Sequence, residues 1–237
     1  MRRLIFAVTA FALVLGIFAT PPAAAQQSVN IFVGGFVPRG FSSRDPNDVL
    51  LNNLACEECF AFRIRDFDGP TAGAEWLVAL GDKFEGGLGV GTYSRNVPSV
   101  YANFTNNDGS EIRQNLKLRV VPFTATVRYL PLGHRDAFEP YIGAGVGVLR
   151  WRYSEGGTFI DFTDPILSTY GGTFTGTGTA TGPVILGGVR VPVGRTDIGG
   201  EIRYQGGKGT LPSDQGFAGS KIDLGGVNYL FTVNIRF

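Results

Sequence analysis

Hydrophobic and polar residues alternate with a period of two along most of the chain beyond residue 25, and a helical period is almost absent there. Such alternation is typical of a β-strand with one apolar and one polar face. The pattern predicts strands at residues 29–38, 73–80, 84–93, 116–130, 138–153, 184–193, 198–205 and 224–237. The sequence therefore indicates a single all-β domain.

Short and long connections alternate between the predicted strands. The connections after the second, fourth and sixth strands are GDK, LGHRDA and GRTD, whereas those after the first, third, fifth and seventh strands are long. Transmembrane barrels have this asymmetry, with tight periplasmic turns and larger extracellular loops. Most segments also have about the 9–11 residues that a tilted strand needs to cross a bilayer. We therefore predict an eight-stranded antiparallel up-and-down transmembrane β-barrel with short periplasmic turns and four long extracellular loops.

Alternation alone does not say which face meets water, because a soluble barrel hides its apolar face and a membrane barrel exposes it. The polar faces mix glycine, hydroxyl and amide groups with a few charges, as at Gly199, Glu201 and Arg203, whereas a solvated face is normally richer in Lys and Glu. Such a face fits a narrow lumen, where charges must pair and glycines make room. The apolar faces fit lipid, in which a sheet must close.

Several charged residues fall on the predicted inward faces of the strands. This set consists of Glu75, Glu85, Arg128, Arg190, Glu201, Arg203 and Arg236. In a narrow barrel we expect opposite charges to meet across the lumen and plug it as a static salt-bridge core. A gate or a narrow conduction path is the alternative interpretation.

The first 25 residues have a different composition from the rest. Arg2 and Arg3 precede an apolar run over 4–18, and Ala23 to Ala25 supply a cleavage pattern. That run is short for a spanning helix, which needs about 20 residues. We predict a cleaved signal peptide at 1–25 and a barrel domain at 26–237.

The charged residues are few and nearly balanced in sign, which argues against nucleic acid as a partner. Charged residues make up 17% of the chain, against about 25% in ordinary soluble domains. The 21 basic and 20 acidic residues nearly balance, so nothing predicts nucleic acid as a partner.

Two candidate reactive sites lie in the predicted connections. Cys56 and Cys59 lie in the first long loop, where an oxidising compartment predicts a local disulfide, although the two-residue spacer strains the ring. A zinc site would need a second ligand pair, and a redox role would need thioredoxin-like surroundings. The single histidine, His134, is expected to be a solvated turn residue, so no histidine base lies near the outer rim. We predict no enzymatic activity, no metal and no cofactor.

Aromatic residues near the strand ends predict either interfacial girdles or ordinary core packing. They are Tyr129, Tyr141, Trp151, Tyr153, Tyr204, Tyr229 and Phe237. Trp151 and Tyr153 are out of phase with the apolar positions before them, which suggests a bulge near Arg150. The Thr/Gly-rich stretch TYGGTFTGTGTATG is expected to be a mobile, exposed loop.

Two segments resemble a known family. EPYIGAGVGV, from Glu139 to Val148, resembles a segment of small outer-membrane β-barrel proteins of the OmpA, OmpX, OmpW and opacity-protein kind. The last strand resembles the assembly signal of outer-membrane proteins, carried here by Tyr229, Phe231, Val233, Ile235 and Phe237.

The resemblance implies a bacterial outer-membrane location and certain partners: membrane lipids and lipopolysaccharide, the barrel-assembly machinery, and an extracellular partner for the loops. It specifies architecture better than function. We expect a structural or surface-interaction role, with a small OmpW-like channel for small or hydrophobic solutes as the alternative.

Overall fold

The computed structural model describes residues 27–54, 60–134 and 137–237, so the predicted signal peptide and the Cys56 and Cys59 pair lie outside the described residues. The barrel strands are β1 (Gln27–Pro38), β2 (Gly69–Ala79), β3 (Phe84–Thr105), β4 (Glu111–Tyr129), β5 (Glu139–Ile160), β6 (Thr169–Val193), β7 (Thr196–Gln205) and β10 (Gly226–Arg236). The connections contain β8 (Lys208–Thr210), β9 (Lys221–Asp223), η1 (Phe41–Ser43), α2 (Val49–Asn52) and η2 (Ile64–Phe67). No helix in this described part is long and apolar enough to cross a membrane.

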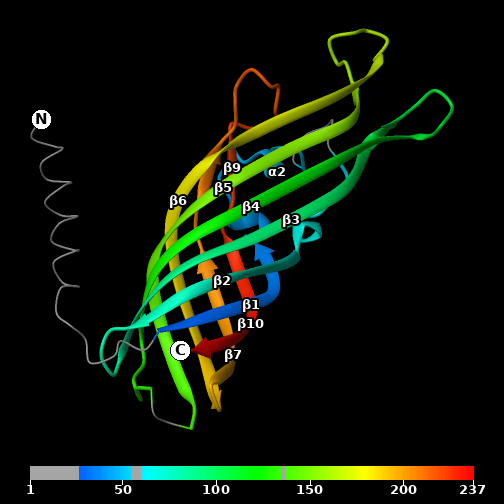
Figure 1. Cartoon of the computed structure of the whole chain (residues 1–237). Helices are drawn as coiled ribbons and strands as arrows, with labels where there is room; N and C mark the ends of the chain where they lie inside the picture. The colour runs from blue at the N-terminus through cyan, green and yellow to red at the C-terminus, as the bar shows by residue number, and fades with distance from the viewer. Residues whose placement is uncertain (1–26, 55–59, 135–136) are drawn as a thin grey trace, which may run out of the picture.

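The eight long strands form one closed antiparallel barrel (Figure 1). Their order around the ring is β1-β10-β7-β6-β5-β4-β3-β2, so strands that follow one another in the barrel pair side by side. Ile31 of β1 pairs with Val233 of β10 on one side and with Ala74 of β2 on the other, and this closes the ring. The predicted fold class is confirmed, since the eight strands form one closed antiparallel ring.

The two ends of the barrel differ. Short connections at 80–83 and 194–195, and the described residues 130–134 and 137–138, lie at one end, which we call the short-turn end. The described residues 39–54 and 60–68 and the connection at 206–225 lie at the opposite end, the long-loop end, together with the tips between β3 and β4 and between β5 and β6. The predicted alternation of connections is therefore present.

Four strands are longer than the sequence pattern predicted. β3 to β6 project past the other strands at the long-loop end (Figure 1), and only 106–110 and 161–168 remain as tips. The predicted limits at 93, 116, 153 and 184 were too short. Two of the four long connections thus consist mainly of paired strand rather than loop.

An apolar belt surrounds the barrel toward the short-turn end. Every barrel strand contributes exposed hydrophobic side chains, among them Val33, Trp76, Leu88, Phe123, Val146, Ile185, Ile202 and Phe231. These eight side chains are 45–64% exposed. So large a continuous apolar surface is what a membrane barrel presents to lipid.

The two faces of β4 and β5 exchange polarity beyond the belt. Toward the short-turn end, Phe123 of β4 points outward while Arg128 is buried inside. Toward the long-loop end, Lys117 and Arg119 are exposed while Leu116 is fully buried. The strand keeps its period of two throughout, so the exchange marks a change of surroundings from lipid to water.

This exchange corrects the prediction of a bulge near Arg150. The pairing of β4 with β5 is unbroken there, since Val121 pairs with Arg150 and Val120 with Trp151. Trp151 and Tyr153 are in phase with the inward face and are buried, as is Tyr141. These three residues therefore do not form interfacial girdles, whereas Tyr129, Tyr229 and Phe237 are exposed.

The Thr/Gly-rich stretch is strand β6 rather than a mobile loop. Its threonines at 177 and 179 are exposed and its glycines at 176 and 178 face inward. A Cβ at Gly178 would lie 3.0 Å from the Trp151 ring, and one at Gly176 would lie 3.5 Å from it. The tighter contact at Gly176 is with Leu211, whose Cδ2 would lie 2.5 Å from the Cβ. The indole ring thus requires glycine at 178 and the Leu211 side chain disfavours a larger residue at 176, and the alternation itself revealed neither contact.

The connection between β1 and β2 folds over the mouth of the barrel. Val49 and Leu50 of α2 are fully buried in the core of the long-loop end. The buried Asp48 carboxylate caps this helix by accepting from the backbone N–H of Leu50 at 3.0 Å, and it also pairs with Arg44 at 2.9 Å. The long-loop end therefore has a packed core of its own.

We predict that this outer core responds to truncation as a soluble core does. Leu116→Ala removes a fully buried side chain and should lower the free energy of unfolding by about 2–5 kcal/mol. The adjacent Lys117→Ala, on the exposed face, should change it by no more than about 0.5 kcal/mol. Equal effects in denaturant titrations of the refolded protein would contradict the assigned faces.

Candidate functional site

The centre of the lumen holds a four-residue ion-pair cluster from three strands. Arg128 Nη2 lies 2.5 Å from Glu75 Oε2 and 3.0 Å from Glu201 Oε2. Arg203 Nη2 lies 2.9 Å from Glu75 Oε2 and 2.6 Å from Glu201 Oε1. All four side chains are at most 5% exposed, and each charge has two opposite charges within 3.0 Å.

Neutral groups complete this central cluster. Asn30 donates to Glu75 Oε2 at 3.2 Å, and the Tyr141 hydroxyl donates to Glu201 Oε2 at 3.0 Å. Gly89 makes room for the carboxylate, because a Cβ there would lie 2.6 Å from Glu75 Cγ. Small and bulky inward residues therefore fill the lumen together.

A second cluster lies at the short-turn end of the lumen. Arg190 lies 2.5 Å from Glu85 and 2.7 Å from Glu139. Arg236 lies 3.2 Å from Glu139 and also pairs with Asp197. Five strands supply this cluster, so it ties together most of the ring.

The structure brings all seven sequence-predicted lumen charges into these two clusters, and it adds Glu139, Asp197 and His134. Asp197 lies on the same inward face of β7 as Glu201. The alternation would have predicted this position if the strand had been taken to begin at residue 196 and not at 198. The prediction that His134 is solvated was wrong. Its side chain is 16% exposed, and Nδ1 lies 3.5 Å from Glu85 Oε1.

Little open space remains beside the clusters. The cavity next to Arg203 and the one next to Arg190 have volumes of about 10 Å³ each. A volume of about 10–15 Å³ accommodates roughly one water molecule. Each of these two cavities therefore has room for about one water molecule beside its cluster.

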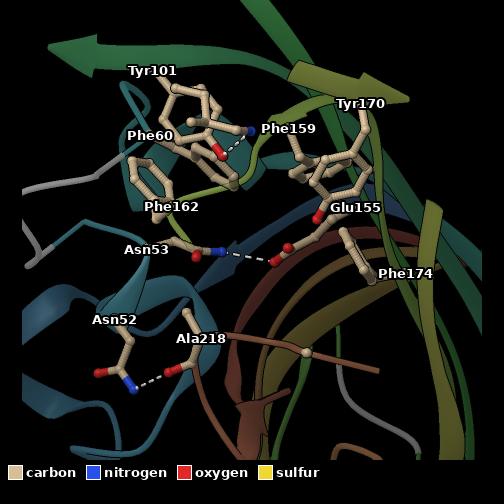
Figure 2. Close-up of a pocket in the computed structure, with 12 residues that line it drawn as sticks. Asn52, Asn53, Phe60, Tyr101, Glu155, Phe159, Phe162, Tyr170, Phe174 and Ala218 are labelled. Atoms are coloured by element: carbon tan, nitrogen blue, oxygen red, sulfur yellow. Dashed lines mark hydrogen bonds between the residues drawn. The ribbon is translucent and has the colours of Figure 1, made fainter. Parts of the chain in front are cut away.

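A larger pocket of about 460 Å³ lies at the long-loop end (Figure 2). It is lined by Asn52, Asn53, Phe60, Tyr101, Glu155, Phe159, Ile160, Phe162, Tyr170, Phe174, Gly216 and Ala218. The rings of Phe60 and Tyr101 pack edge to face at 5.1 Å, and those of Phe159 and Phe174 do so at 4.8 Å. Six of the twelve lining residues are thus aromatic, and their rings pack against one another.

Glu155 is the charged residue of this pocket. Its Oε1 accepts hydrogen bonds from Asn53 Nδ2 at 2.7 Å and from the Tyr153 hydroxyl at 2.8 Å, and Figure 2 shows it between Asn53 and the Phe174 ring. Among the described residues it has no cationic partner. Burial raises the pKa of the Glu155 carboxyl above that of an exposed glutamate, although both hydrogen bonds oppose the shift.

Sequence reasoning missed this pocket. Glu155 follows Trp151 and Tyr153 on the inward face of β5. A carboxylate on a face that is otherwise aromatic is the one signal by which the sequence could have indicated this pocket. The partners that surround it come from distant connections, which alternation does not bring together. No group of three or more His, Cys, Asp or Glu side chains in the described ranges is placed to hold a metal ion.

The residues of the predicted assembly signal lie on the last barrel strand and just beyond it. Tyr229, Phe231 and Ile235 point outward into the apolar belt with exposures of 55%, 52% and 42%. Val233 is partly buried, and the backbone N–H of Phe237 donates to Gln27 O at 3.0 Å. They are positioned on the outer face, where another protein or lipid could contact them.

We predict that the central cluster tolerates loss of one charge poorly. Glu201→Gln leaves Arg128 and Arg203 with a single shared carboxylate, and should lower the free energy of unfolding by about 3–5 kcal/mol. Glu111→Gln removes one member of an exposed pair with Arg113 and should lower it by no more than about 1 kcal/mol. Denaturant titration of both variants measures the difference, and a stable Glu201→Gln barrel would show that the cluster is not tightly coupled.

Comparison with protein-family models and with curated proteins finds no match. Among solved structures, the chain is similar to Neisserial surface protein A, with 11% identity, a TM-score of 0.50 and coverage of 92% of this chain and 100% of that chain. Two further matches have TM-scores of 0.41: the N-terminal β-barrel domain of Pseudomonas aeruginosa OprF, at 14% identity with coverage of 90% and 99%, and E. coli outer membrane protein W, at 15% identity with coverage of 91% and 100%. The chain has the fold of the small eight-stranded outer-membrane β-barrels.

Proposed function

We propose that the protein is a bacterial outer-membrane barrel that binds an extracellular ligand at its long-loop end and does not conduct solutes. One contrast supports this: two ion-pair clusters fill the lumen, whereas a pocket of about 460 Å³ lies at the long-loop end. Short turns face the periplasm in such barrels, which directs the pocket to the exterior. Export with a cleaved signal peptide at 1–25, and recognition of the last strand by the assembly machinery, belong to the same proposal.

The chemistry of the pocket favours a compact ligand that carries an ammonium group. A carboxylate buried without a cationic partner is costly, and a bound cation would offset that cost. Aromatic faces attract cations as well, and they surround Glu155 on several sides. Binding is favoured over catalysis because the described lining residues include no His, Cys, Ser or Lys.

We predict that the refolded protein gives no steady single-channel currents in planar lipid bilayers, because the clusters leave only water-sized cavities. Three single variants, Arg128→Ala, Arg190→Ala and Arg203→Ala, show whether any current passes through the lumen. Steady wild-type currents that change in these variants would refute the closed lumen and support the OmpW-like channel.

We predict that phenyltrimethylammonium, used as a probe, binds the folded protein in detergent and that Glu155→Gln weakens this binding by about tenfold. Binding should also weaken as the pH falls through the raised pKa of Glu155, because protonation removes the charge that attracts the probe. Isothermal titration measures both effects.

Glu111→Gln serves as the matched control, since it removes a carboxylate on the exposed face of the neighbouring strand. It should leave probe affinity unchanged. Equal affinity of wild type and Glu155→Gln, or no binding at all, would contradict a cation site in this pocket.

A further inference from the structure

A cluster of cations lies on the outer surface of β4 and β5, next to the apolar belt. Arg119 and Arg152 are directly opposite each other across the two strands, and Arg150 is opposite Val121. All three arginines are exposed. None of them forms an ion pair with any residue of the described ranges. By contrast, Arg113, which lies on the same face of β4 but nearer the 106–110 tip, pairs with Glu111 at 3.2 Å.

This arrangement is unfavourable for the isolated chain. Like charges directly opposite on neighbouring strands destabilise a sheet. No carboxylate directly opposite on β3 or β6 relieves the repulsion, because Ser94 of β3 faces Arg119 and the facing residues of β6 are Thr177 and Thr179. An anion bound between the guanidinium groups would remove it.

The shape of the surface indicates what kind of anion fits. A groove of about 690 Å³ is lined by the three arginines, by the threonines at 177 and 179, and by Val121 and Phe123. Phe123 is 50% exposed and belongs to the apolar belt. Donors for an anion and a surface for hydrocarbon are therefore continuous within one groove.

We propose that this groove binds the phosphate-bearing headgroup of a lipid in the outer leaflet. The guanidinium groups of Arg119, Arg150 and Arg152 would donate to phosphate oxygens, as arginine does in bidentate anion recognition. The threonine hydroxyls are placed to donate further bonds, and the acyl chains would lie on Val121 and Phe123. The inference rests on the proposed membrane orientation, and it assigns a lipid site that is separate from the pocket around Glu155.

The test measures binding of dioleoyl phosphatidic acid to the folded protein in nonionic detergent micelles. Replacing Arg119, Arg150 and Arg152 together by Gln should weaken binding by about 100-fold, and each single replacement by about fivefold. The control variant replaces Arg63, Arg65 and Arg113 by Gln, which removes the same charge from exposed positions outside the groove. Its affinity should equal that of the wild type.

Two further probes separate a lipid site from other sites. Inorganic phosphate at the same concentration should not compete, and dioleoylglycerol, which lacks the phosphate, should not bind at the groove. Competition by inorganic phosphate would show a simple anion site, and equal binding of dioleoylglycerol would show an apolar surface. Either result, or equal loss of affinity in the control variant, would overturn the proposal.

The single replacements keep the test valid if the triple variant fails to fold. The outcome is also independent of ligand binding in the pocket and of lumen conductance. If the lipid site fails while phenyltrimethylammonium still binds and no current is seen, the proposed function stands without this inference.

Discussion

Closure of the sheet is the constraint on which the rest of the structure depends. β1 pairs with both β2 and β10, so every strand of the ring has a neighbour on each side within the closed part of the barrel. Closing a ring of eight strands leaves an interior only as wide as the side chains that fill it. Each inward residue must therefore fit its neighbours across the lumen, either as paired charges or as packed rings.

The buried charges also fix the register of the strands. On β4, Arg128 points inward and its neighbours Val127 and Tyr129 point outward. A slip of one residue would place the guanidinium in lipid and valine in the ion-pair cluster, and both changes are unfavourable. The central cluster therefore acts less as a source of net stability than as a device that rejects wrong pairings.

Sequence alternation was sufficient to predict the closed barrel and the inward phase of residues such as Arg128 and Glu201, because a period of two survives in every strand. It failed where the surroundings change. At Arg150 the outward face becomes charged and the inward face becomes aromatic, so an unbroken strand looked like a bulge. The contact of His134 with Glu85, and the pocket around Glu155, depend on connections far away in the chain.

The exchange of polarity beyond the belt explains why two different sites can share the same strands. Along β5, Trp151 faces the inner core while Arg150 and Arg152 face outward. The alternating residues of β5 therefore contribute both to the aromatic core of the long-loop end and to the basic groove on the outer surface. Lipid held by the outer face would fix the projecting strands against the membrane, and these strands carry Glu155. The groove and the pocket thus lie on opposite faces of the same strands, without any lining residue in common.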